Sequence, residues 1–196
     1  MRFILASSSP RRSDLLAQIG LRFEVIPPQF DESRVDASDP AELVHSLARE
    51  KAGAVAAEVE GPAVVLGADT IVLLDGEVLG KPRDEAEARS MLARLAGRTH
   101  RVLTGVALIR TPEGPILVQH EETHVTMRPL TPGQIHAYVA SGEPMDKAGA
   151  YAVQGLGSVL VERIQGDYFN VVGLPLPRLA LMLESLGLDV LDVAAR

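Results

Sequence analysis

The stretch FILASSSPRR, residues 3–12, decides the fold. Its first four residues, 3–6, are an apolar run that predicts a buried strand. The helix that follows is expected to have Ser9 as its N-cap, Pro10 at its first position and Gly20 as its stop. Backbone N–H groups at a helix start carry partial positive charge, so the serines and arginines here form a candidate phosphate seat. The alternative is a well-capped helix with two solvated arginines.

Strand-like and helix-like patterns alternate along the rest of the chain. A charged residue, Asp69, interrupts one apolar run and predicts a break in that strand. The alternation predicts an α/β protein with a mixed sheet. The length of 196 residues suggests one large domain or two small lobes, and a single domain over residues 1–196 is expected. Further strands are expected at residues 23–26, 63–67, 71–74, 99–110, 115–128 and 158–164. One helix is expected to begin with Asp39 as N-cap and Pro40 at its first position, and to be broken at 61–62. Others are expected at 84–95, between the cap Thr131 and Gly142, and at 176–186.

Composition narrows the class of ligand and the compartment. The chain has 196 residues, a net charge of −7 and no clustered basic run, which argues against nucleic acid as a partner. The absence of cysteine excludes disulfides, thiolate catalysis and Cys-ligated zinc. No apolar stretch approaches the roughly 18 residues of a membrane span, and residues 1–6 are too short for a signal peptide. A cytoplasmic protein that binds a small anionic ligand is therefore expected.

Two charged residues stand out as candidates for chemistry. Asp69 lies between two apolar runs, where an unpaired charge is costly, so it is expected to have a partner, a metal or a catalytic task. A solvated carboxylate at a strand end is the alternative. Lys81 lies between Gly80 and Pro82, and it could bind phosphate as a point charge or simply occupy a surface turn. A Walker A loop is excluded because Pro82 replaces the required Ser or Thr.

Residues 120–124, HEETH, match the zinc-protease pattern HExxH. That pattern requires a helix, but the flanking residues favour a strand. In a strand the two histidines, His120 and His124, would lie about 13 Å apart. They could not share a zinc ion, so a metalloprotease is disfavoured.

Eight segments together resemble the Maf family of nucleoside triphosphate pyrophosphatases. They follow one another in the family's order and cover nearly the whole chain. No single segment is decisive, but the set is specific. The segments are LASSSPRR (5–12), EKA (50–52), GADT (67–70), GKP (80–82), SGEP (141–144), DKAGAY (146–151), QG (154–155) and GDYFNVVGLPL (166–176).

The resemblance implies an elongated mixed sheet flanked by helices, with two lobes around a central nucleotide-binding cleft. It implies hydrolysis of a nucleoside triphosphate to the monophosphate and pyrophosphate with a divalent cation, Mg²⁺ or Mn²⁺. The segment 146–154 resembles the branch that acts on dTTP and UTP. The family also suggests a homodimer, and its association with arrest of septum formation supplies an alternative, in which the protein acts mainly by binding a partner or a nucleotide.

The resemblance and the chemistry of the side chains assign roles to nine residues. Asp69 is expected to accept a proton from the attacking water, or to orient that water, and to bind the metal together with Glu32. Lys81 is expected to act beside it on the phosphates. Base choice is expected to depend on Arg12, Thr70 and Gln154. The full set of expected substrate-binding residues is Ser7, Arg11, Arg12, Lys51, Thr70 and Gln154.

Overall fold

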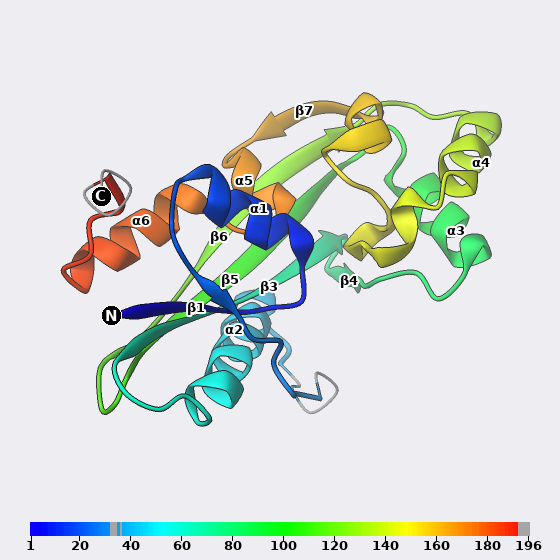
Figure 1. Cartoon of the computed structure of the whole chain (residues 1–196). Coiled ribbons are helices and arrows are strands. Elements are labelled where there is room, and N and C mark those ends of the chain that lie inside the picture. Colours follow the sequence, from blue (N-terminus) through cyan, green and yellow to red (C-terminus); the bar gives the residue numbers. More distant parts are fainter. Residues whose placement is uncertain (32–34, 36, 192–196) are drawn as a thin grey trace. The chain divides into compact units, whose positions relative to one another are not determined.

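The structure is a computed structural model that describes residues 1–31, 35 and 37–191 (Figure 1). The chain divides into two compact units, and the long strands run from one into the other. One unit comprises Met1–Asp69, Thr104–Glu121 and Gly173–Arg196, and the other comprises Thr70–Leu103 and Glu122–Val172. The cleft expected between two lobes stays a prediction.

A mixed sheet of seven strands is the framework of the protein, as predicted. The strand order is β2-β1-β3-β5-β6-β7, and β4 pairs with β3. Strand β1 runs parallel to both β2 and β3, whereas β4 is antiparallel to β3 and β7 is antiparallel to β6. The strands are β1 (Arg2–Ala6), β2 (Glu24–Val25), β3 (Ala63–Leu74), β4 (Glu77–Leu79), β5 (Thr99–Thr111), β6 (Ile116–Met127) and β7 (Val161–Gln165).

In the first unit, helix α2 (Pro40–Ala56) packs very closely against the sheet. It begins as predicted, with Asp39 as N-cap and a proline at the first position. A Cβ added at Gly67 of β3 would lie 2.7 Å from the backbone nitrogen of Ala52 in α2. Only glycine therefore allows the helix and the strand to approach this closely. This unit also contains α1 (Pro10–Gln18) and α6 (Leu176–Ser185).

In the second unit, helices α3 (Glu85–Leu95) and α4 (Pro132–Ala140) lie side by side (Figure 1). Both begin with a side-chain cap, from Asp84 and from Thr131, and the cap at Thr131 is as predicted. A buried cluster that includes Leu92, Tyr138 and Tyr151 fixes the helices to the strands. Short 3₁₀ helices, η2 (Glu143–Asp146), η3 (Ala148–Ala150) and η4 (Gly155–Leu160), follow α4.

Three local expectations differ from the structure. Strand β3 does not break at Asp69, because Lys51 neutralises the charge and the strand continues. Residues 158–160 belong to η4 instead of to β7. A short helix, α5 (Tyr168–Val172), was not expected, and it begins where Asp167 Oδ1 accepts a hydrogen bond from the Phe169 N–H at 2.8 Å. No helix of the described residues is both long and apolar enough to cross a membrane.

Candidate active site

A buried ion pair occupies the middle of strand β3. Lys51 Nζ of α2 donates to Asp69 Oδ1 at 2.5 Å, and the residues are 9% and 8% exposed. Two charges are rarely buried unless they are paired, and this pair satisfies that condition. The solvated carboxylate considered as an alternative for Asp69 is therefore wrong. The pair instead brings together a carboxylate and a cation that were predicted to serve catalysis and phosphate binding.

The start of helix α1 holds two of the other predicted residues in contact. Arg12 donates from Nε to the carbonyl of Gly173 at 2.9 Å and from Nη1 to Ser7 Oγ at 3.2 Å. Ser7 Oγ also accepts from the Ser9 N–H at 3.1 Å. Ser9 is the N-cap by position, but its own side chain makes no capping hydrogen bond. Arg12 is therefore fixed by its neighbours, and the solvated arginine considered as an alternative is wrong for this residue.

The first turn of α1 also carries Arg11, which is half-buried. An arginine offers a planar fork of donors that matches phosphate oxygens. Backbone N–H groups at the same helix start add partial positive charge. The arrangement around Ser7, Arg11 and Arg12 thus has the chemistry expected of a phosphate-binding site. That a nucleotide binds there stays a prediction.

Thr70 is the residue after Asp69 in β3 and is half-buried. Successive side chains of a strand point to opposite faces of the sheet. Thr70 therefore faces away from the side on which Asp69 meets Lys51. A role in base choice requires that it act from that opposite face.

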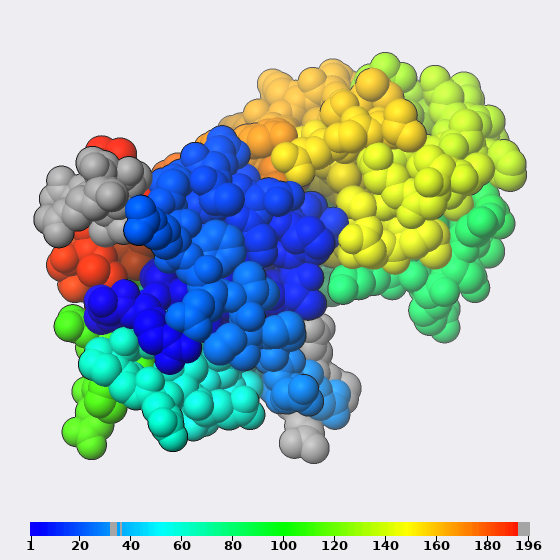
Figure 2. All heavy atoms as spheres, viewed as in Figure 1, coloured from blue at the N-terminus to red at the C-terminus, as the bar shows by residue number. Residues whose placement is uncertain are grey.

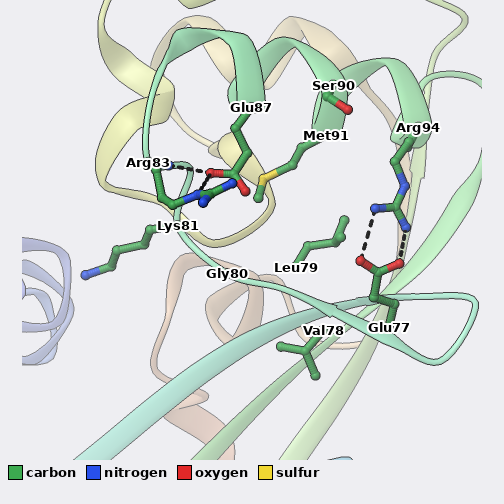
Figure 3. A pocket seen from close by; sticks show the side chains of 10 residues that line it. All are labelled: Glu77, Val78, Leu79, Gly80, Lys81, Arg83, Glu87, Ser90, Met91 and Arg94. Atoms are coloured by element: carbon green, nitrogen blue, oxygen red, sulfur yellow. Dashed lines mark hydrogen bonds and ion pairs between the residues drawn. The ribbon is translucent and has the colours of Figure 1, made fainter. Parts of the chain in front are cut away.

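Lys81 is exposed and lies just after β4, in the second unit. It lines a pocket of about 290 Å³ between β4 and α3 (Figure 3). The other charged side chains of this pocket are paired with one another: Arg94 with Glu77 at 2.6 Å and Arg83 with Glu87 at 2.9 Å. Figure 3 shows the Lys81 side chain extending away from both ion pairs. Its charge is therefore available to an anion outside the pocket.

Gln154 is exposed and lies immediately before η4, with an extended backbone at φ −110° and ψ 171°. Two residues before it, the backbone N–H of Ala152 donates to the Tyr138 hydroxyl. Two and three residues after it, backbone N–H groups donate to the carboxylate of Glu143. In the sequence, Glu143 stands out only as part of the segment SGEP (141–144), and no role is predicted for it. Its hydrogen bonds join it to residues 13 and 14 positions away, which no local pattern predicts.

The metal prediction is tested only in part. Glu32 lies outside the described residues, so its predicted role stays a prediction. Among the residues that the structure describes, no three His, Asp or Glu side chains converge on a common point where a metal could bind. Asp69 is thus the one predicted metal ligand that is placed, and its Oδ1 is bonded to Lys51.

The two histidines of the HEETH segment lie in strand β6, as predicted, and do not form a zinc site. His120 Nδ1 is 2.8 Å from Nε2 of His45 in α2, so one ring donates to the other. His124 is instead 3.8 Å from Glu122. The helical geometry that a zinc protease needs is absent from this segment.

Comparison with known proteins gives a match over almost the whole chain. A family model described as "Maf-like protein" matches residues 2–186. The dTTP/UTP pyrophosphatase of Symbiobacterium thermophilum is 58% identical over 189 residues, which is 96% of each chain. The proteins of the same name from Moorella thermoacetica and Bacillus cereus (strain AH820) are 56% and 50% identical over 189 residues, covering 96% of this chain and 97% of theirs.

Proposed function

The chain belongs to the family of Maf-like proteins, and from that premise we propose that it hydrolyses dTTP and UTP to the nucleoside monophosphate and pyrophosphate. Relatives that carry the name dTTP/UTP pyrophosphatase align with 96% of this chain. The structural observation that supports the proposal most directly is the buried Lys51–Asp69 pair in a strand where an unpaired carboxylate would not persist.

The reaction joins a water molecule to the α-phosphorus and releases pyrophosphate. Such a step depends on positioning and on neutralising the phosphate charge more than on covalent help from the protein. Asp69 would accept the proton of the attacking water through its carboxylate or orient that water. Lys51 fixes the orientation of this carboxylate through the hydrogen bond to Oδ1. Arg11, Arg12 and Lys81 would offset the negative charge of the phosphates.

A divalent cation such as Mg²⁺ or Mn²⁺ would be held by Asp69 and Glu32, of which the structure describes Asp69. Mg²⁺ usually keeps several waters and is held by one or two carboxylates together with substrate phosphates. Asp69 would supply one carboxylate, and Glu32 would supply the second. When bound, the cation neutralises phosphate charge and favours ionisation of a bound water.

The choice of base would rest on Gln154. Its amide carries both a donor and an acceptor, and the N3–H and carbonyl edge of uracil or thymine offers the complementary pair. Gln154 is exposed, so its amide is accessible to a ligand. The predicted contribution of Thr70 and Arg12 to base choice rests only on the resemblance to the family.

The alternative, a protein that arrests septum formation by binding alone, is not favoured. A pure binding surface does not require a carboxylate and an ammonium group to be buried together in a strand, at the desolvation cost of both charges. The proteins in the comparison are also named for catalysis.

The test is a panel of nucleoside triphosphates incubated with Mg²⁺ and the purified chain, with the products identified. We expect dTTP and UTP to give the monophosphate and pyrophosphate. Release of orthophosphate and a nucleoside diphosphate would refute attack at the α-phosphorus. A strong preference for 7-methyl-GTP would refute the assignment to the branch that acts on dTTP and UTP.

The same panel tests the base contact with Gln154→Ala. Gln154 is exposed in the free chain, but a bound base would bury its N3–H and carbonyl edge against the amide. A polar edge that is buried without its partner costs about 1–3 kcal/mol, or roughly five- to 150-fold. We expect kcat/KM for dTTP and UTP to fall by that factor while CTP and purine triphosphates lose less. Gln165→Ala, at an exposed position of β7, is the matched control and should change nothing. Equal losses on every nucleotide would place Gln154 at the phosphates instead.

A further inference from the structure

The carboxylate of Glu143 is bound on both oxygens by the loop that carries Gln154. Oε1 accepts the backbone N–H of Gly157 at 2.9 Å, and Oε2 accepts the backbone N–H of Leu156 at 2.9 Å. Successive backbone N–H groups in such a turn form a concave site for an anion, and here the anion is part of the protein. A carboxylate can only accept hydrogen bonds, so its chemistry matches this row of donors.

Tyr138 of α4 holds the other end of the same loop. Its hydroxyl donates to Glu143 Oε1 at 2.9 Å and accepts the backbone N–H of Ala152 at 3.2 Å. Tyr138 is 5% exposed and belongs to the buried cluster of this unit, and its hydroxyl is fixed by these two hydrogen bonds. We call this arrangement the Glu143–Tyr138 clamp. It binds the chain two residues before Gln154 and two and three residues after it.

Two glycines let the loop close tightly on the clamp. A Cβ at Gly155 would lie 2.6 Å from Glu143 Oε2, and a Cβ at Gly157 would lie 2.7 Å from Tyr138 Oη. Gly155 also has a φ of +62°, the left-handed region that side chains rarely adopt. The backbone that follows Gln154 is thus packed directly against the two clamp side chains.

Further contacts fix the carboxylate's own backbone. Lys147 Nζ donates to the main-chain carbonyl of Glu143 at 2.5 Å and to Asp146 Oδ1 at 2.6 Å, which closes the short helix η2. Glu143 follows α4 by only a few residues, and its N–H donates to Ser141 Oγ at 3.2 Å. The clamp therefore connects the Gln154 loop to a rigid element of the second unit. Figure 2 shows the segment around residue 150, in yellow, at the surface of the molecule.

We propose that Glu143 is a positioning residue for base discrimination, which acts by holding Gln154 in place through the Glu143–Tyr138 clamp. The inference rests on the proposed function, in which Gln154 reads the pyrimidine edge. A hydrogen-bonding amide discriminates between bases only if it is held in the matching position, and a displacement of about 1 Å is enough to weaken such a contact. Neither Glu143 nor Tyr138 needs to touch the substrate for this role.

The critical variant is Glu143→Gln, which keeps the shape of the side chain. An amide presents one acceptor oxygen and one NH₂ donor. In either orientation the NH₂ group faces a backbone N–H, from Leu156 or from Gly157, and one hydrogen bond of the clamp is replaced by a repulsion. Glu85→Gln is the matched control, because it removes the same charge from an exposed residue of α3 that contacts only Arg89 among the described ion pairs, at 3.2 Å.

The first measurement is kcat/KM for dTTP relative to CTP. We expect Glu143→Gln to lower this ratio about tenfold, through KM for dTTP more than through kcat. Tyr138→Phe, which keeps the buried ring and removes the hydroxyl, should lower it in the same direction. Glu85→Gln should leave the ratio unchanged. An unchanged ratio in both clamp variants would overturn the proposal.

A double-mutant cycle with Gln154→Ala separates positioning from general loss of structure. If Glu143 acts through Gln154, Glu143→Gln should have little further effect on the dTTP-to-CTP ratio once Gln154 is alanine. Full additivity would show that Glu143 acts independently and would refute the inference while leaving the base contact intact. If Gln154→Ala alone leaves the ratio unchanged, the proposed base contact is wrong, and the inference falls with it.

Amide hydrogen exchange gives a reading that does not depend on activity or on full stability of the variants. We expect faster exchange at Leu156 and Gly157 in Glu143→Gln, and faster exchange at Ala152 in Tyr138→Phe. Exchange within β3 should remain as in the parent chain. Unchanged exchange at all three amides would show that the clamp does not hold the loop, and would refute the proposal.

Discussion

The ion pair between Lys51 and Asp69 permits one prediction with a defined magnitude. Its side chains are 11% and 12% exposed and its two charged atoms are 2.5 Å apart. Removal of one partner from a buried pair leaves an uncompensated charge and costs about 3–5 kcal/mol of unfolding free energy. We expect about 3 kcal/mol for Asp69→Asn, because the asparagine oxygen can still accept a hydrogen bond from Nζ.

The same substitution should also remove turnover. Asparagine keeps the shape of the side chain but can neither accept the proton of the attacking water nor offer a charge to a metal. We expect the transition state to lose about 2–4 kcal/mol of stabilisation, which lowers kcat/KM roughly 30- to 1000-fold. The protein should remain folded under assay conditions, since the predicted loss is smaller than the stability of a typical domain.

A double-mutant cycle distinguishes the structural role of the pair from its catalytic role. Lys51→Met keeps an apolar stem of similar length and leaves Asp69 as the uncompensated charge. The combination Lys51→Met with Asp69→Asn buries no charge, so it should be more stable than the sum of the single losses by about 2 kcal/mol. It should not regain turnover. In this double variant we expect stability to recover and catalysis not to recover, because only catalysis requires the carboxylate.

The assay is urea unfolding followed by circular dichroism, together with single-substrate kinetics on dTTP. Glu85→Gln, which breaks an exposed pair with Arg89, is the control and should cost about 0.3–0.5 kcal/mol. Strictly additive losses in the cycle would show that the two charges do not stabilise each other. Near-normal turnover in folded Asp69→Asn would exclude Asp69 from the mechanism.

Three further predictions concern titration and the histidines. Burial raises the pKa of Glu143, but hydrogen bonds from its partners lower it more, so the net pKa lies below its ordinary value of 4.5. The stability that this carboxylate contributes should therefore be present above pH 4.5 and be lost as the pH falls below that value. In urea unfolding, Glu143→Gln should abolish this loss of stability at acid pH. Burial lowers the pKa of His100 to about 4, whereas unfolding restores its ordinary value of 6.5. Between these values the unfolded chain takes up a proton that the folded chain does not, so wild-type stability should fall as the pH drops from about 6.5 towards 4. His100→Gln, which can keep the hydrogen bond to Tyr151 without titrating, should flatten this part of the pH profile, and an unchanged slope would show that His100 is not its source. His120→Ala and His124→Ala should leave activity and metal dependence nearly unchanged, whereas stoichiometric zinc that is lost on either substitution would contradict the strand geometry.

The sequence predicted the elements whose signals are local. The start of α1 depends on Pro10, and the start of α2 depends on Asp39 and Pro40, and each of these residues lies within one turn of the boundary it sets. The alternation of strands and helices likewise predicted the mixed sheet. The HEETH segment was assigned correctly to a strand, because its apolar and β-branched flanks outweighed the motif.

Features that depend on distant partners could not be predicted in the same way. The break expected at Asp69 does not occur, because its counter-charge, Lys51, lies 18 residues earlier and on another element. The hydrogen bonds of Glu143 could not be predicted either, because the donors lie 13 and 14 residues later in a loop that has no periodic pattern. In both cases a charged side chain is stabilised by groups that only the fold brings near it.

The placement of the ion pair follows from the packing of small residues. Gly67 and Asp69 are two residues apart in β3, so both point to the same face of the sheet. At Gly67 that face lies against the backbone of α2 at Ala48 and Ala52, with no room for a Cβ. Lys51 lies one position before Ala52, on the same buried side of the helix. Because glycine and alanine let the helix approach the strand this closely, the lysine reaches a carboxylate that would otherwise be buried without a partner. The composition of this helix–strand contact thus creates the charged pair on which the proposed chemistry depends.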